Sequence, residues 1–370
     1  MKRILLLNDT AATCNPGCQA ASAGVRGAYS EVWTQAEFRS LPVGYWAELF
    51  RDLATPSREC VIRAPGTFPR GREFTPPIDL PAFVERVDEL AGSDAELTAL
   101  GEWADLVVVN GEGSVHHHFP RALALLGLIK TLSRSRPVHL VNCTLQGIDS
   151  ELWKLVGDVL AGVHVRESRS AEFVRSRRGA VLLTPDLAFQ HLRHLDLSRP
   201  CTEPQTRRCL LTSGVLVSRE GLREQLEVLR AHDLDPVYLC IGDGGEEKIA
   251  REVCGSETTL VDAGPLGPRG VIELARECSL AVSGRHHVNL FLAAASVPFI
   301  PLPSNTWKVE STLQDLGYPL FPCQDASALD RALTDLGKNK NSLRHAAWGM
   351  FLKGMEMVRE FGPGVNSWKS

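Results

Sequence analysis

The apolar stretch from Cys278 to Ala293 constrains the fold of this chain most strongly. The run stops at Gly284 and resumes with helical spacing, which predicts a strand, a tight turn and a helix. In an open α/β sheet this junction lies at the carboxyl edge, where ligands bind and a helix N-terminus favours negative charge. Arg285, His286 and His287 occupy the turn. They predict an anion site with an acid or base beside it, unless the arginine pairs with a surface carboxylate and the histidines cap or pack.

The alternation of strand and helix recurs along the chain. Apolar runs predict strands at 3–8, 105–110, 137–143, 162–166, 181–183, 208–212, 236–241, 258–261, 278–283 and 298–302, with helices between most of them. Such βα repeats form parallel sheets. The fold class is therefore predicted to be α/β, with two Rossmann-like domains whose parallel sheets face each other across a cleft.

The length of 370 residues exceeds one comfortable hydrophobic core. A polar segment with two prolines, 198–207, predicts the boundary between a first domain of 1–198 and a second of 199–341. The helical C-terminal segment, 342–370, is expected to pack back on the first domain. Residues 53–81 are rich in Pro, Arg and Gly and predict an irregular surface excursion.

Charge and cysteine content narrow the functional classes. The net charge is −4 and no basic stripe is present, so nucleic acid is a poor candidate partner. The apolar run after Met1 is too short for a signal peptide, and no segment has the length of a membrane span. Ten cysteines without CxxC pairs suit reduced thiols. These observations predict a cytoplasmic protein.

Two loops of the first domain are candidate ligand contacts. The loop after the first strand carries Asn15 and Gly17, and the loop after the strand at 105–110 carries Gly111, Glu112 and Gly113. Glycines there let backbone amides approach a ligand. The third glycine of the dinucleotide-binding fingerprint is missing, so the loop does not predict a dinucleotide site. His116, His117 and His118 follow. Consecutive histidines rarely converge on one ion, so a sugar-binding or acid/base role is expected, with no metal and no cofactor.

Arg166 and Lys308 complete the candidate site. Arg166 ends a predicted strand and is expected to point into the cleft opposite Arg285, although a strand-end arginine often pairs with a carboxylate, here Glu167 or Asp186. Lys308 begins a helix and offers a point charge to a phosphate, unless it is a solvated surface lysine. If Arg166 and Lys308 serve a ligand rather than the fold, their replacement should hardly change stability.

The order of these motifs resembles the polysaccharide pyruvyl transferase family. The resemblance spans most of residues 1–320, and its most telling part is the turn Ser283–His287, with Pro298 and Lys308 downstream. Shorter matches lie at Asn15 and Gly17, Gly111–Gly113, Val165–Glu167 with Ser170, Pro185–Asp186 and Leu313–Gly317. His286 departs from the family pattern, and so does the histidine-rich loop.

The resemblance implies a GT-B-like fold and transfer of pyruvate from phosphoenolpyruvate onto sugar hydroxyls as a ketal. The acceptor would be a cell-surface glycan or its lipid-linked precursor, which implies peripheral association with the inner face of the membrane. Arg166, Arg285, His287 and Lys308 match the donor site, and His287 is the candidate acid/base. The alternatives are a GT-B glycosyltransferase with a nucleotide-sugar donor and a catalytically silent glycan-binding relative.

Overall fold

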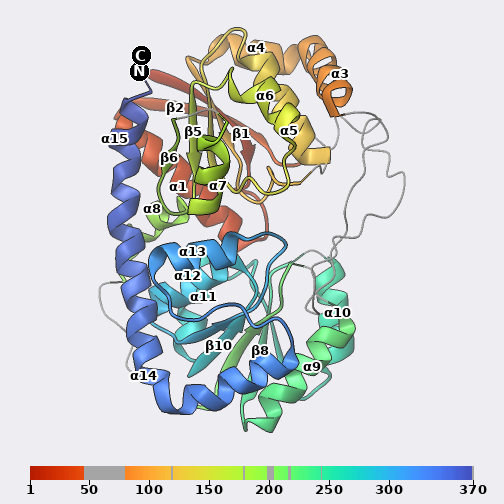
Figure 1. Cartoon of the computed structure of the whole chain (residues 1–370), viewed down its shortest axis with the longest axis vertical. Helices are drawn as coiled ribbons and strands as arrows, with labels where there is room; N and C mark the ends of the chain where they lie inside the picture. The colour runs from red at the N-terminus through yellow and green to blue at the C-terminus, as the bar shows by residue number, and fades with distance from the viewer. Residues whose placement is uncertain are drawn as a thin grey trace.

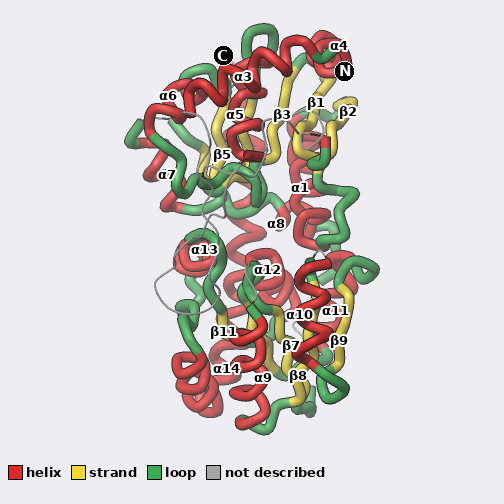
Figure 2. Tube along the Cα trace, turned by 90° about the vertical axis from the view of Figure 1, so that its right-hand side faces the viewer, coloured by secondary structure: helices red, strands yellow, loops and turns green. Residues whose placement is uncertain are grey.

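The computed structural model describes residues 1–45, 80–117, 120–177, 180–197, 204–215, 218–242 and 244–368. Within them the chain forms two α/β domains, each built on a parallel sheet, stacked end to end (Figures 1 and 2). The prediction of two Rossmann-like domains is confirmed. His118, residues 53–79 and most of the predicted domain boundary, 198–203, lie outside the described residues.

The first domain contains a six-stranded sheet of order β2-β1-β3-β4-β5-β6. Its strands are β1 Lys2–Asp9, β2 Ala36–Pro42, β3 Leu106–Asn110, β4 Val138–Cys143, β5 Gly162–Val165 and β6 Leu182–Leu183. Its helices are α1 Pro16–Val32, α3 Leu80–Ser93, α4 Ala95–Trp103, α5 Pro120–Leu132, α6 Ser150–Gly157, α7 Ser168–Arg175 and α8 Ala188–Leu192. All residues of β3 and β4 are buried, as expected for a sheet covered by helices on both faces.

The second domain contains a five-stranded sheet of order β11-β10-β7-β8-β9. Its strands are β7 Arg208–Thr212, β8 Asp235–Cys240, β9 Thr259–Asp262, β10 Leu280–Ser283 and β11 Phe299–Pro301. Its helices are α9 Arg219–Ala231, α10 Gly244–Cys254, α11 Gly267–Arg276, α12 His286–Ala295 and α13 Lys308–Leu316. Every residue of α12 is buried, which explains why its sequence from Leu290 to Ala295 is apolar all round.

A long C-terminal helix spans both domains. Helix α14, Ala326–Met357, begins at Asp325, whose side chain accepts a hydrogen bond from the backbone N–H of Ala328. It runs along one side of the molecule into η1 Val358–Glu360 and α15 Phe361–Asn366, and α15 packs against α1 and β6 of the first domain (Figure 1). The helix begins sixteen residues before the helical segment predicted at 342–370, within the predicted second domain.

Polar contacts also join the domains beside the cleft. The backbone N–H of Ser168 donates to Asp315 across 2.7 Å, and that of Trp307 donates to the side-chain oxygen of Gln146 across 2.6 Å.

Within the described residues, no helix is both long and apolar enough to cross a membrane.

Candidate functional site between the domains

The carboxyl edges of the two sheets enclose a pocket of about 380 Å³. The first domain contributes the loops after β1 and β3, and the second contributes the turn into α12 and the residues before α13. Eight of the residues predicted from the sequence line it: Asn15, Gly17, Glu112, Gly113, Arg285, His286, His287 and Lys308. Gly111, His116, His117, Arg166 and Asp186 are not among the described residues that line it.

The turn between β10 and α12 is held tightly by backbone contacts. Gly284 donates its N–H to the carbonyl of Thr212, and a Cβ on Gly284 would come within 2.7 Å of the backbone of Gly214. Because backbone atoms cannot give way cheaply, only glycine fits here. The turn places Arg285, His286 and His287 at the start of α12, where amide N–H groups without helical partners favour an anion.

Arg285 is paired within its own domain. Its Nη2 lies 2.5 Å from a carboxylate oxygen of Glu246 on α10, and the other oxygen of Glu246 accepts a hydrogen bond from Tyr238. The side chain of Arg285 still lines the pocket with 14% of its surface exposed. An anion bound there would share the guanidinium with Glu246, a partner that could not be identified from the sequence.

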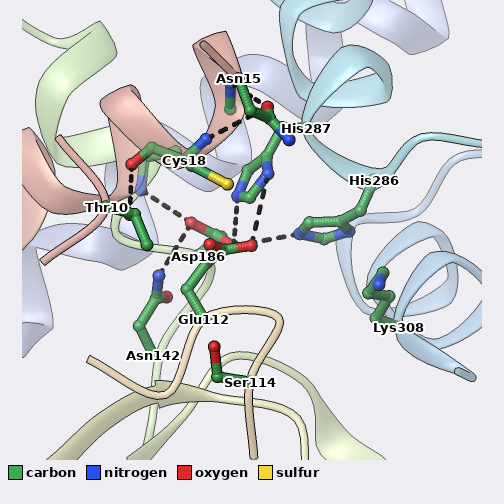
Figure 3. Close-up of polar contacts among 12 residues, drawn as sticks. Thr10, Asn15, Cys18, Glu112, Ser114, Asn142, Asp186, His286, His287 and Lys308 are labelled. Carbon is green, nitrogen blue, oxygen red and sulfur yellow. Dashed lines mark hydrogen bonds and ion pairs between the residues drawn. The ribbon is translucent and has the colours of Figure 1, made fainter. Parts of the chain in front are cut away.

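Asp186 lies at the centre of a buried cluster that joins both domains (Figure 3). Its Oδ2 lies 3.1 Å from Nε2 of His286 and 3.2 Å from Nε2 of His287, so two histidines of the second domain converge on one carboxylate of the first. Burial lowers the pKa of His286 to about 3, and the charge of Arg166 acts in the same direction. His286 is therefore neutral near pH 7, which leaves His287 as the acid/base candidate at this turn.

The prediction that Arg166 points into the cleft is wrong. Its Nη1 lies 2.6 Å from Oδ2 of Asp186 and its Nε donates to Thr144, while only 1% of the side chain is exposed. The strand-end arginine instead holds the carboxylate that follows β6, which is the alternative left open above. A divided anion site made of Arg166 and Arg285 is therefore not present.

Lys308 is buried at the pocket rather than solvated. Its Nζ donates to the side-chain oxygen of Asn305 across 2.6 Å. Burial lowers the pKa of Lys308 to about 7, and the charge of Arg166 adds to that effect. The lysine can therefore gain or lose its charge near neutral pH, which a surface lysine cannot do.

The loops of the first domain approach His287 closely. Asn15 caps α1, since its side-chain oxygen accepts hydrogen bonds from the backbone N–H groups of Gly17 and Cys18. A Cβ on Gly17 would come within 2.4 Å of the His287 ring. A carboxylate oxygen of Glu112 lies 3.8 Å from Nδ1 of His287. Both Gly17 and Glu112 thus define the side of the ring that faces the pocket.

The remaining predicted loop residues lie behind the pocket wall. A Cβ on Gly111 would come within 2.5 Å of Cys143, so this glycine serves close packing. Nδ1 of His116 lies 2.9 Å from Nδ1 of His117, and Nε2 of His116 lies 3.5 Å from the side-chain nitrogen of Asn305. Burial holds the pKa of His116 well below its usual range, with the charge of Lys308 acting in the same direction.

One group of described residues has the ligand spacing of a metal site. The ligand atoms of Asp186, His286 and His287 lie within 4.8 Å of one another. The guanidinium of Arg166 contacts the same carboxylate oxygen, and a cation beside that charge would be repelled. Nε2 of each histidine already contacts Oδ2 of Asp186, so the cluster fits an ionic network better than a metal.

Several pocket residues were not predicted from the sequence. Cys18, Arg121, Asn305 and Val215 line the cavity. Cys18 follows Gly17 directly, and Arg121 follows the proline that begins α5, so proximity to a predicted loop or helix start is the signal that could have found them. Asn305 lies on a segment without any recognisable pattern.

Solved structures of similar architecture confirm the GT-B-like fold. No protein-family model and no curated protein matches this sequence. The UDP-GlcNAc 2-epimerase from Neisseria meningitidis, bound to UDP-GlcNAc, is similar with a TM-score of 0.62 and 10% identity over 99% of this chain and 100% of that one. S. aureus MnaA in complex with UDP is similar with a TM-score of 0.58 and 12% identity, over 97% of this chain and 94% of that one. Phytolacca americana UGT2, complexed with UDP-2fluoro-glucose and pterostilbene, is similar with a TM-score of 0.50 and 11% identity, over 100% of each chain. At these identities the similarity establishes the fold.

Proposed function

We propose that this protein is an enzyme that transfers a group to a saccharide in the pocket between its two domains, with phosphoenolpyruvate as the donor. The observation that carries the proposal is the convergence of Arg285, His287 and Lys308 on one pocket at the N-terminus of α12. These are the three pocket residues that match the donor site of the pyruvyl transferases. A phosphate and a carboxylate need this combination of cations and amide donors.

Each residue has a defined part in the proposed reaction. Arg285 and the first turn of α12 hold one anionic group of the donor, and protonated Lys308 holds the other. His287 delivers a proton to the methylene carbon while a sugar hydroxyl adds to C2, which converts the double bond to a methyl group. A second hydroxyl of the sugar then bonds to C2 and gives its proton to His287, while the C–O bond to phosphate breaks, so inorganic phosphate leaves and the ketal closes. Glu112, near Nδ1 of His287, is placed to accept a hydroxyl proton.

A nucleotide-sugar donor is the second candidate. The similar solved structures include enzymes bound to UDP, UDP-GlcNAc or a UDP-glucose analogue, and this favours a sugar nucleotide whose diphosphate lies at the start of α12. The same first turn and Arg285 would then bind the diphosphate. The two candidates share the pocket and the saccharide acceptor, and they differ in the leaving group.

The leaving group therefore decides between the two donors. Purified protein would be incubated with phosphoenolpyruvate or with a panel of UDP-sugars, each with glycan and lipid-linked acceptors, while inorganic phosphate, UDP and product mass are followed. Phosphate release with a ketal product of the acceptor, lost in His287→Gln, would support pyruvyl transfer. Release of UDP, or epimerisation of the UDP-sugar, would contradict it. Saccharide binding without any product would indicate a glycan-binding protein.

A further inference from the structure

The carboxylate of Asp186 acts on the pocket indirectly. Its side chain is fully buried and does not line the pocket, whereas both histidines that it contacts do. Its Oδ1 accepts hydrogen bonds from Asn142 and from the backbone N–H of Ala188, and its Oδ2 pairs with Arg166. Three groups of the first domain thus hold this carboxylate independently of the second domain.

We infer that Asp186 is a positioning residue that fixes the tautomer and orientation of His287 across the domain interface, so that Nδ1 exchanges protons with the pocket. The inference rests on the proposed role of His287. Nε2 of His287 lies 3.2 Å from Oδ2 of Asp186, and an ionised carboxylate only accepts hydrogen bonds. Nε2 must therefore carry a hydrogen, and Nδ1 of the neutral ring must be without one.

The surroundings of Nδ1 agree with that assignment. A Cβ on Gly17 would come within 2.4 Å of Nδ1, so this atom faces the first turn of α1, where Gly17 lines the pocket. On the same side, Glu112 lies 3.8 Å away and stabilises the ring when Nδ1 becomes protonated. Although burial alone would raise the pKa of Asp186, the charge of Arg166 and the hydrogen bonds from His286 and His287 hold it well below its usual range.

Both domains are needed to form the proposed acid/base. His287 begins α12 of the second domain, while Asp186 follows β6 of the first. The histidine is therefore oriented for proton transfer only where the domains meet as they do here. Separation of the domains would leave the ring free to exchange its tautomers.

Nitrogen NMR of the histidine rings tests the inference without any substrate. Protein labelled with ¹⁵N-histidine would be recorded by long-range ¹H–¹⁵N correlation, with the His287 signals identified by their loss in His287→Gln. The wild type should show the Nε2–H tautomer of His287. Asp186→Asn should mix the tautomers, reduce kcat by about 10²–10⁴-fold and change the KM for phosphoenolpyruvate little.

Two further variants separate positioning from folding. Asp186→Asn leaves Arg166 unpaired, so the double variant Asp186→Asn with Arg166→Gln removes that defect and should show the same mixed tautomers. Thr144→Val, which removes only the partner of Arg166 Nε, should lower stability and keep the wild-type tautomer. An Nδ1–H tautomer in the wild type, or an unchanged tautomer in both Asp186 variants, would overturn the inference. Because the spectra require no turnover, a dependence on Asp186 without pyruvyl transfer would refute the proposed function alone.

Discussion

Arg166 and Asp186 form an ion pair of 2.6 Å in which neither side chain is exposed by more than 1%. The pair joins the end of β5 to the loop after β6 and lies beneath the two histidines of α12. Removing one partner of a buried pair leaves an uncompensated charge in the protein interior, which costs far more than the pair contributes.

Arg166→Ala should therefore lower the free energy of unfolding by about 3–5 kcal/mol, measured by urea denaturation. This replaces the expectation from sequence that the variant would melt near the wild type. Arg3→Ala is the matched control, because Arg3 pairs with Asp105 at 2.7 Å in the same domain but is 40% exposed. A loss for Arg166→Ala no larger than that for Arg3→Ala would contradict the structural role.

Gly17→Ala should reduce turnover and lower the free energy of unfolding by about 1–3 kcal/mol, the usual cost of overpacking. The added Cβ would come within 2.4 Å of the His287 ring and must displace it, and a misplaced acid/base loses much of its effect. Turnover should fall by up to about 10²-fold, the scale of a misplacement of about 1 Å. Gly27→Ala, on the same helix with its nearest contact at 3.6 Å, should keep full turnover. Equal activity of the two variants would show that the ring tolerates the methyl group.

A strand or helix could be predicted from the sequence where its signal lies within one short run of residues. The predicted bounds of β7 agree with the structure because the strand is a short apolar run. The helix predicted to follow it is α9, which Ser218 caps. Strand β2 was missed because it is an edge strand in which six of seven residues are at least partly exposed. Periodicity cannot reveal such a strand.

The same holds for the candidate site, where some residues were predicted and their partners were not. Parallel strands end at one edge of a sheet, so the sequence placed Arg285, His287 and Lys308 near one another. The partner of Arg166 could not be identified from the sequence, because only the pairing of β5 with β6 brings Asp186 next to Arg166. The pairing of Arg285 with Glu246 depends on the packing of α10, which no spacing encodes.

His286 should be neutral near pH 7, and its protonation on unfolding should lower the free energy of unfolding in acid. Its pKa is about 3 in the folded protein, through burial first and then the charge of Arg166, and about 6.5 in the unfolded chain. Between these values the unfolded state binds more protons, so stability falls as the pH decreases from about 6.5 to about 3. His286→Gln should weaken this dependence in urea denaturation at several pH values. An identical pH dependence in the variant would show that His286 is not the group responsible.

Lys308 should take up a proton when phosphoenolpyruvate binds. Burial first, and then Arg166, lower its pKa to about 7, so at pH 8 the free enzyme holds mostly neutral lysine, and an anion favours the charged form. Calorimetric titration at pH 8 in two buffers of different ionisation enthalpy should give an uptake approaching one proton. Donor affinity should fall up to about tenfold per pH unit above pH 7. Lys308→Arg, which stays charged, should bind without proton uptake and without this pH dependence. If uptake persists in Lys308→Arg, the proton goes to His287 or to another histidine near the pocket, and Lys308 is not the group that responds to the donor.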